Sequence, residues 1–212
     1  MKGVTLRTER LILRDLPPSA AGHVARFYRE NWDFHRPWEP HRDARYFEAA
    51  AQRRILSAER RSDAMLHLWL LLRQGSGHRR AIRWRGPEVI GSVTLSAIVR
   101  GSFQSCFLGY KMDARYTRRG YMSEALVAVL DYAFSAARMH RVEANVMPVN
   151  VASRGLLDTL GFREEGRARD YLRIQGRWED HIHMVMLADE WYARPGTARP
   201  SELLVHENLD RG

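Results

Sequence analysis

The sequence predicts a single mixed α/β (α+β) domain. Short segments in which apolar and polar residues alternate, as in strands, recur along the chain, and segments with apolar residues at helical spacing lie between them. No repeat, low-complexity tract or linker interrupts the chain before about Tyr192. With 212 residues, of which 45% are hydrophobic, the chain can bury a sizeable core. We therefore expect one folded domain.

The first quarter of the chain is expected to hold one strand and two helices. Residues 5–15 alternate in polarity and predict the strand, which two prolines end. Ser19 is suited to cap a helix that runs to Tyr28. An aromatic loop at residues 32–40 and a polar helix at residues 42–61 are expected to follow.

The middle of the chain predicts three strands and a buried helix. Residues 66–73 and 88–100 are expected to form strands on either side of a turn rich in Gly and Arg at residues 75–86. Another strand is predicted at residues 103–112. The helix that begins at about Gly120 has apolar residues at i, i+3 and i+4 spacing, so one of its faces must be buried.

The last part of the domain predicts a strand, a short helix and a strand pair. Residues 141–147 alternate as in a strand, and Asn150 begins a helix that Gly161 can close in the left-handed conformation. Residues 162–174 and 178–187 are expected to pair as antiparallel strands.

Charge and cysteine content limit the cellular setting. The net charge of +9 is carried almost wholly by arginine, because only Lys2 and Lys111 are lysines. Such a surface attracts RNA, a ribosome or a phosphorylated cofactor. The base composition of the genome would explain the excess of arginine equally, without any function. Cys106 is the single cysteine, as is typical of a reducing compartment. The longest apolar run, near residues 65–72, is too short for a membrane span, so we expect a cytoplasmic protein without membrane contact.

One turn is suited to bind phosphate. Residues 118–123 lie where a predicted strand leads into a helix, so backbone N–H groups are free at the positive end of the helix dipole. Gly120 allows close approach of a ligand to the backbone, and Arg115, Arg118 and Arg119 can reach phosphate oxygens. An ordinary helix start is the simpler alternative for this turn when it is considered alone.

The segments after this turn carry a family resemblance. Residues 147–162 combine Asn150 and Ser153 at a helix start with a Leu-Gly-Phe ending, and the whole arrangement resembles the GNAT superfamily of acetyltransferases. Further segments resemble its RimJ branch, which acetylates the N-terminal alanine of small-subunit ribosomal protein five: FYRENWDFHRPWEP (27–40), IVRGSFQSCFLGY (98–110), RRGYMSEAL (118–126) and RDYLRIQGRWEDH (169–181). The resemblance covers residues 6–191, and residues 192–212 are expected to form a mobile tail.

The resemblance implies a mixed, mostly antiparallel sheet flanked by helices, in which the central strands at residues 107–111 and 142–146 splay apart. The pantetheine arm of acetyl-CoA would lie in the gap, and a backbone N–H near residues 108–110 would polarise the thioester oxygen. Thr117 departs from the family pattern, which often has Gln or Arg there. The implied acetyl-CoA contacts are Leu108, Gly109, Tyr110, Arg115, Arg118, Arg119, Gly120, Tyr121, Met122, Ser123 and Asn150.

The reaction also requires a base. An α-amine has a pKa near ~8, so a proton must leave before the amine attacks. Asp170 lies where related enzymes place an acidic residue suggested as base, although a solvated strand carboxylate is the alternative. Glu39 is the second candidate, for holding or deprotonating the ammonium. Trp32, Trp38 and Tyr171 are expected to shape the acceptor site.

The leaving thiolate needs modest help from an acid. Ser153 matches the family serine proposed for this role, with Tyr110 and Tyr171 as alternative donors. Asn150 is expected to order water or pantetheine, to cap the helix, or both. No base neighbours Cys106 in the sequence, which favours direct transfer in a ternary complex. The nine histidines show no convincing zinc spacing, so no metal is expected.

The expected acceptor is therefore the N-terminal alanine of a ribosomal protein, most directly small-subunit ribosomal protein five. Two alternatives stay open at this point. The amine could belong to a small molecule, such as a polyamine or an antibiotic. The chain could instead be a ribosome- or RNA-binding assembly factor that docks through its basic surface, with catalysis secondary.

Overall fold

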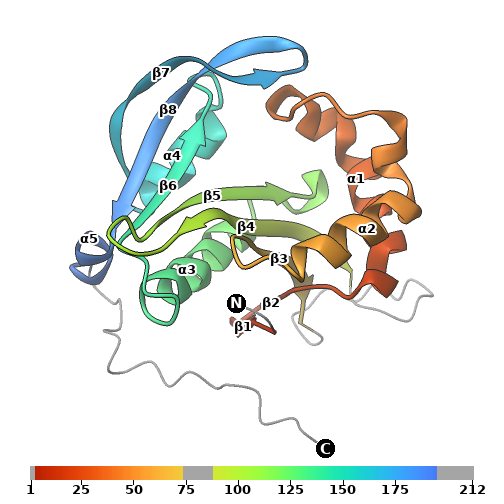
Figure 1. The fold of residues 1–212 in the computed structure, drawn as a ribbon, viewed down its shortest axis with the longest axis horizontal. Helices are drawn as coiled ribbons and strands as arrows, with labels where there is room; N and C mark the ends of the chain where they lie inside the picture. Colours follow the sequence, from red (N-terminus) through yellow and green to blue (C-terminus); the bar gives the residue numbers. More distant parts are fainter. Residues whose placement is uncertain (1–2, 74–87, 195–212) are drawn as a thin grey trace, which may run out of the picture.

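The computed structural model describes residues 3–73 and 88–194 of the chain, and in these residues eight strands form one sheet (Figure 1). The strand order is β1-β2-β3-β4-β5-β6-β8-β7, and every neighbouring pair is antiparallel except β5 and β6. The strands are β1 (Thr5–Arg7), β2 (Leu11–Arg14), β3 (Leu66–Leu72), β4 (Val89–Val99), β5 (Ser105–Met112), β6 (Arg141–Val146), β7 (Arg163–Ile174) and β8 (Arg177–Leu187).

Helices cover both faces of the sheet (Figure 1). The longer ones are α1 (Ala21–His35), α2 (Ala49–Glu59), α3 (Tyr121–Phe134), α4 (Val151–Thr159) and α5 (Ala188–Tyr192). Four 3-10 helices are η1 (Pro18–Ala20), η2 (Arg36–Trp38), η3 (Ala44–Phe47) and η4 (Ala114–Tyr116). No helix in the described parts of the chain has the length and apolar character needed to cross a membrane.

Two cores result from the alternation of side chains along β3. Leu68 and Leu70 point into the larger core, which α3 and α4 complete. Trp69 and Leu71 point the other way, into a smaller core closed by α1 and α2. Because successive side chains of a strand face opposite sides, a nearly continuous apolar strand such as LHLWLLL predicts helices on both faces.

The central strands β5 and β6 splay apart, as the predicted fold requires. They pair only between Ser105–Phe107 and Arg141–Glu143, whereas β5 continues to Met112 and β6 to Val146. Backbone groups of β5 beyond Phe107 that face β6 therefore have no partner strand. This confirms the mixed, mostly antiparallel sheet with splayed central strands.

The structure corrects the expected elements near the N-terminus. The strand predicted at residues 5–15 is a hairpin of β1 and β2, because the Thr8 N–H donates to the Leu11 carbonyl at 3.0 Å and turns the chain. Ser19 lies within η1 and does not cap α1, whose N-cap is Ala20 and makes no side-chain hydrogen bond. The two prolines before Ser19 set up this 3-10 turn instead.

The expected aromatic loop and polar helix are also different. Trp32 lies inside α1, which continues to His35 because Phe27, Asn31 and His35 stay buried at helical spacing. Only the end of that segment leaves the helix, as η2. The helix predicted at residues 42–61 is divided into η3 and α2 at Glu48, whose backbone is extended.

The remaining expected elements are confirmed to within two or three residues at their ends. Gly161 has φ +80° at the end of α4, and Gln175 and Gly176 form the turn between β7 and β8. The predicted turn at residues 75–86 lies outside the described residues, as do residues 195–212 of the predicted tail. The boundary at residue 192 stays a prediction, although it coincides with the end of α5, whose Trp191 is buried and donates to Asp131 on α3 at 2.7 Å.

Candidate active site

The turn predicted to bind phosphate has a left-handed backbone at two positions. Arg118 has φ +57° and Gly120, the N-cap of α3, has φ +76°. The Glu124 N–H donates to the Gly120 carbonyl at 3.0 Å, and the N–H groups that precede it are those a helix start leaves without intrahelical partners. Their direction and the helix dipole suit an anion.

Side chains of this turn divide into exposed and buried sets. Arg118, Arg119 and Gly120 are exposed, whereas Tyr121 and Met122 are buried in the larger core. The predicted cofactor contacts at Tyr121 and Met122 are therefore possible only through their backbone groups. The Arg119 guanidinium lies 5.5 Å from the centre of the Tyr116 ring.

A clamp from the N-terminal hairpin holds this turn, and the sequence alone does not predict it. Glu124 on α3 accepts hydrogen bonds from the Thr8 hydroxyl, the Arg10 backbone N–H at 2.8 Å and Arg10 Nε at 2.6 Å. Arg10 also donates to the Arg119 carbonyl at 3.0 Å and covers the Tyr121 ring. Burial would raise the pKa of Glu124, but the hydrogen bonds from Thr8 and Arg10 outweigh burial and lower it.

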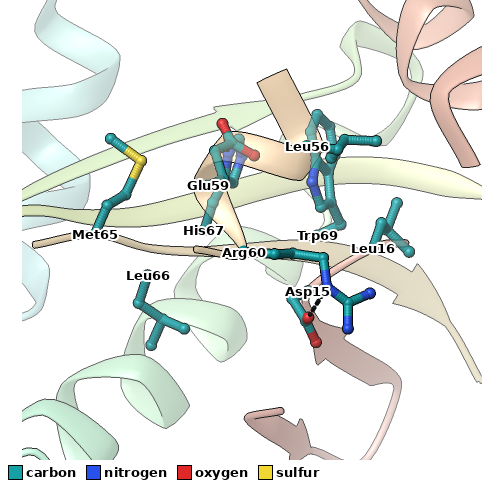
Figure 2. Close-up of a pocket in the computed structure, with 9 residues that line it drawn as sticks. All are labelled: Asp15, Leu16, Leu56, Glu59, Arg60, Met65, Leu66, His67 and Trp69. Carbon is teal, nitrogen blue, oxygen red and sulfur yellow. Dashed lines mark hydrogen bonds and ion pairs between the residues drawn. The ribbon is translucent and has the colours of Figure 1, made fainter. Parts of the chain in front are cut away.

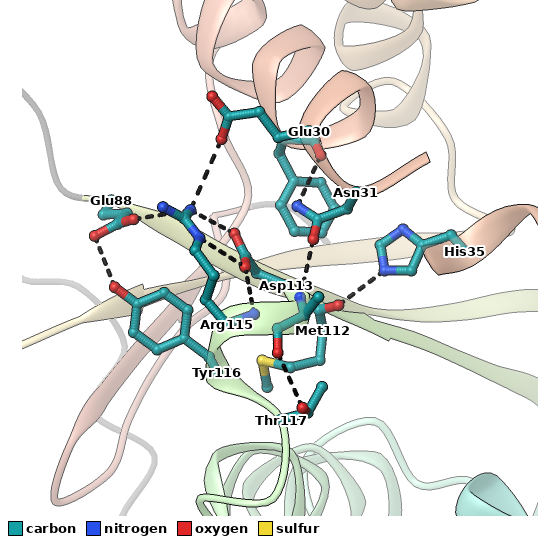
Figure 3. Close-up of polar contacts among 11 residues, drawn as sticks. Glu30, Asn31, His35, Glu88, Met112, Asp113, Arg115, Tyr116 and Thr117 are labelled. Carbon is teal, nitrogen blue, oxygen red and sulfur yellow. Dashed lines mark hydrogen bonds and ion pairs between the residues drawn. The ribbon is translucent and has the colours of Figure 1, made fainter. Parts of the chain in front are cut away.

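Arg115 lies in a cluster of carboxylates (Figure 3). Its guanidinium contacts Asp113 at 2.6 Å, Glu88 at 3.2 Å and Glu30 at 3.8 Å. Asp113 is only 2% exposed, and burial alone would raise its pKa, but hydrogen bonds from the Arg115 side chain and backbone lower it. Arg115 is thus engaged by the protein itself, and its predicted phosphate contact remains a prediction.

The same region ties α1 to the end of β5 (Figure 3). Asn31 Oδ1 accepts the Ala114 N–H at 2.9 Å, and His35 Nε2 lies 2.8 Å from the Met112 carbonyl oxygen. Burial lowers the pKa of His35, so its neutral ring donates this hydrogen bond. Thr117, where the family often has Gln or Arg, donates its hydroxyl to the Ala114 carbonyl at 3.0 Å.

Two predicted hydroxyls meet on the side of the sheet that α3 and α4 cover. Tyr110 Oη on β5 lies 2.6 Å from Ser153 Oγ at the start of α4. Burial raises the pKa of Tyr110 to about 12, against the opposing effect of the Ser153 hydrogen bond. Asn150 Oδ1 accepts the Ser153 N–H at 3.1 Å, which confirms that Asn150 caps α4.

Glu39 lies near the opposite face of β5. Lys111 Nζ is 2.9 Å from one of its oxygens, and Arg42 is 3.5 Å from the other. Gln175, at the tip of the β7–β8 hairpin, donates to the Glu39 carbonyl at 2.8 Å. Of the aromatic residues predicted nearby, Trp38 is partly exposed, whereas Trp32 packs against Phe47.

Asp170 lies in an irregular part of β7. Its φ is +50°, the register with β8 shifts between Ala168 and Leu172, and its side chain is exposed. Its backbone N–H donates to Asp180 Oδ1 at 3.0 Å. Tyr171, by contrast, packs its ring 5.0 Å from that of His183 on β8. The structure therefore brings Tyr171 onto the sheet and leaves the Asp170 carboxylate in solvent.

Cys106 is unsuited to covalent catalysis. It is 1% exposed, and burial raises the pKa of its thiol to about 12, so the thiolate is scarce at neutral pH.

A pocket lies apart from these residues, between α2 and β3 (Figure 2). His67 Nδ1 is 2.8 Å from Glu59 and the ring of His67 stacks on Trp69, while Arg60 pairs with Asp15 at 3.3 Å. None of the predicted site residues lines this pocket.

Residues 10–163 match the family described as acetyltransferase (GNAT) domain. The chain is 36% identical over 190 residues to the ribosomal protein uS5-alanine N-acetyltransferase of Escherichia coli (strain K12), which covers 89% of this chain and 93% of that protein. It is also similar to the crystal structure of ribosomal-protein-S5-alanine acetyltransferase from Vibrio fischeri, with 29% identity, a TM-score of 0.77, and coverage of 89% of this chain and 98% of that one. Mycobacterium smegmatis RimJ in complex with CoA-disulfide gives 30% identity and a TM-score of 0.76, over 89% of this chain and 88% of that one.

Proposed function

Because this chain belongs to the acetyltransferase (GNAT) family and is an acetyl-CoA-dependent N-acetyltransferase, we propose that it acetylates the N-terminal alanine of ribosomal protein uS5. The E. coli relative that supports this acceptor is similar to the chain over almost its whole length. The ribosomal acceptor in turn supports a cytoplasmic location.

One observation carries the proposed acetyl transfer: β5 and β6 splay apart beside the turn at Arg118–Gly120. We propose that the diphosphate of acetyl-CoA binds the free N–H groups before Glu124, with Arg118 and Arg119 as its cationic partners. The arm that carries the acetyl group would then enter the gap. A backbone N–H of residues 108–110, freed where β6 departs, would donate to the thioester oxygen.

We assign the protonation of the leaving CoA thiolate to Tyr110 and Ser153. Both hydroxyls stay protonated at neutral pH, and their 2.6 Å contact holds them as one donor unit beside the gap. As the C–S bond breaks, this unit would stabilise and protonate the thiolate, while Asn150 fixes Ser153 by capping α4.

The proposed transfer is direct, from acetyl-CoA to the amine. The buried state of Cys106 supports this, because a covalent acetyl-enzyme would need an accessible thiolate. For the base, Asp170 and Glu39 remain the candidates that the sequence predicts. Glu39 already neutralises Lys111, which makes it better suited to position a ligand than to carry a proton.

The basic surface supports a second contact, with the ribosome itself. We propose that exposed arginines outside the cofactor turn, such as Arg138, add a non-specific attraction to RNA, which would fall steeply with salt. Co-sedimentation with ribosomes across a salt series tests it, and a flat profile contradicts it.

The acceptor is tested by following thiol release from acetyl-CoA with peptides that begin with the uS5 sequence. Matched peptides starting with Ala, Ser or Met, the same Ala peptide with a blocked amine, and free spermidine complete the panel. We expect the highest kcat/KM with the Ala peptide and none with the blocked one. Preference for spermidine, or no release with the Ala peptide, would overturn the proposed acceptor.

A further inference from the structure

Beyond the residues already assigned, a histidine and a glutamate lie on the sheet face opposite the Tyr110 hydroxyl. Phe107 pairs with Glu143, so Glu143 shares its face with Phe107 and, four residues along β5, with Lys111. Asn145 pairs with His183, which places His183 on that face too. Glu143 is the last residue of β6 that pairs with β5. Asn145, the partner of His183, lies two residues further along β6, so His183 is level with the gap between β5 and β6.

Glu143 and His183 form a close polar pair. His183 Nδ1 lies 2.7 Å from Glu143 Oε1, and the other carboxylate oxygen accepts from Arg141 at 2.8 Å. Arg141 is in turn paired with Glu165 on β7 at 2.6 Å. Burial would raise the pKa of Glu143, but the hydrogen bonds from Arg141 and His183 lower it, so this buried carboxylate stays ionised.

This contact determines which ring nitrogen of His183 carries hydrogen. An ionised carboxylate only accepts hydrogen bonds, so Nδ1 must be the donor and the neutral ring has its lone pair on Nε2. The side chain of His183 is 25% exposed, which leaves the ring accessible from the face of the sheet. A carboxylate that fixes the tautomer of a histidine and stabilises its charged form is the arrangement of a general base.

The surroundings of the ring support this role. From β7, Tyr171 packs edge-on against His183 at 5.0 Å, and Asn145 on β6 lies 3.4 Å from the Tyr171 hydroxyl. From β8, the ring of His181 also lies 5.5 Å from that of the same tyrosine. The ring is thus paired with the charged group Glu143 and, behind it, Arg141.

The two carboxylates predicted as base are less well placed. Asp170 is exposed in an irregular part of β7, and its backbone is held by Asp180. Glu39 is occupied by Lys111 and Arg42. Lys111 holds the Glu39 carboxylate at the unpaired part of β5 as an ion pair, whereas Glu143 accepts from His183 Nδ1 and leaves Nε2 of the ring available.

Resting on the proposed function, we infer that His183 is the proton acceptor for the attacking amine and that Glu143 is its positioning residue. Nε2 takes one proton from the acceptor ammonium, and the freed lone pair forms the C–N bond at the thioester carbon. Collapse of the tetrahedral intermediate breaks the C–S bond, and the thiolate takes a proton from the Tyr110–Ser153 unit. The nitrogen of the intermediate loses its second proton to solvent before collapse. His183 then gives its proton to solvent and the Tyr110–Ser153 unit takes one back, so the net products are the acetylated amine, CoA thiol and one proton.

This assignment separates the two proton transfers onto opposite faces of the sheet. The base approaches from the side of Lys111, and the acid from the side of α4. The amine then attacks one face of the planar thioester carbonyl, and the sulfur leaves the tetrahedral carbon toward the Tyr110–Ser153 unit. Solvent returns the two groups to their starting protonation states after each turnover.

The test compares His183→Gln, Glu143→Gln and Asp170→Asn with the full-length protein, using whichever amine of the panel above the wild type acetylates best. His183→Gln should lower kcat by about 10²-fold or more, with CoA affinity unchanged by calorimetry. In the pH profile of kcat/KM, this variant should lose the limb that is due to the base. Its kcat/KM should instead rise with the fraction of free amine, up to about pH 8. Glu143→Gln should give a smaller loss of kcat, and imidazole added to His183→Ala should restore part of the rate.

His181→Gln is the matched control, because it removes a neighbouring imidazole that contacts the same tyrosine. We expect its turnover to stay near that of the wild type. Turnover of His183→Gln within about twofold of wild type, or an equal loss in His181→Gln, would overturn the inference. If Asp170→Asn instead abolishes the fall of kcat/KM at low pH, the role of proton acceptor would return to Asp170. A wild type that binds CoA but acetylates no amine of the panel would overturn the proposed function as well.

Discussion

The hydroxyl oxygens of Tyr110 and Ser153 lie 2.6 Å apart, although 43 residues separate them in the sequence. One comes from the middle of β5 and the other from the first turn of α4, and the contact spans the part of the sheet where β5 has no β6 partner. Two protonated hydroxyls in contact at this point are the feature on which the proposed leaving-group chemistry depends.

Tyr110→Phe and Ser153→Ala should therefore reduce kcat by about 10²-fold each, with a smaller change in the KM for acetyl-CoA. The double variant should lose no more than the worse single variant, because the hydroxyls act as one unit. Tyr132→Phe on α3 is a suitable control, since its hydroxyl belongs neither to this contact nor to the predicted cofactor residues. Additive losses in the double variant would contradict a shared role. Thiol release at saturating acceptor provides the measurement.

Gly120→Ala should weaken CoA binding by about tenfold, because φ +76° costs a side chain about 1–2 kcal/mol. A Cβ at this position would also lie 3.3 Å from an Arg10 nitrogen and press on the clamp. Gly155→Ala on α4, where a Cβ meets nothing within 4 Å, should bind CoA as the wild type does. Calorimetric titration with CoA compares them, and equal affinities would show that the turn does not contact the cofactor.

The three arginines of the cofactor region should separate into two classes. Arg118→Gln and Arg119→Gln should raise the Kd for CoA, more so at low salt, with little effect on stability. Arg115→Gln should instead lower the free energy of unfolding by about 1–3 kcal/mol, because it leaves the buried Asp113 carboxylate without its main partner. Urea unfolding and CoA titration on all three distinguish the classes. A stable Arg115→Gln with weakened CoA binding would restore the phosphate role first predicted for it.

Stability should depend on pH through Glu124. Its pKa in the folded protein lies below the ordinary 4.5, so the carboxylate stabilises the fold above that value and ceases to do so as pH falls through the lowered folded pKa. Glu124→Gln should cost about 1–3 kcal/mol near neutrality, and the difference from wild type should shrink in acid. Urea unfolding at several pH values measures it, with exposed Glu164→Gln as the control. A difference independent of pH would show that shape rather than charge matters.

The sequence predicted the elements whose local pattern is strong. The α3 helix, the Asn150 cap and the Gly161 ending depend on residues within a few positions of one another, and all three are present. The N-terminal errors have the opposite origin. Trp32 stands in an aromatic segment that ends in prolines and predicts a loop, but the contacts of Asn31 with η4 and of His35 with the end of β5 extend α1 through it.

The site residues also divide into those that local sequence predicts and those that depend on distant contacts. Tyr110, Ser153 and Asn150 were named from the sequence and meet in space. The contacts of Glu124 and His183 could not be anticipated, because Arg10 lies in the turn between β1 and β2 and Glu143 lies on another strand, and local periodicity does not reveal which distant segments meet. Arg115 shows the converse: its position suits a phosphate, yet nearby carboxylates compete for the same guanidinium.

The clamp between Arg10 and Glu124 joins residues 114 positions apart, so it bears on how the protein is made. At ribosomal rates of elongation, the N-terminal hairpin is synthesised roughly ten seconds before its partner helix exists. The loop it must close is long, and closure waits until the chain has been made as far as α3. The turn proposed to receive the cofactor is thus held in place only after β1 to β5 have been synthesised, so CoA binding would report that the N-terminal hairpin and α3 have met.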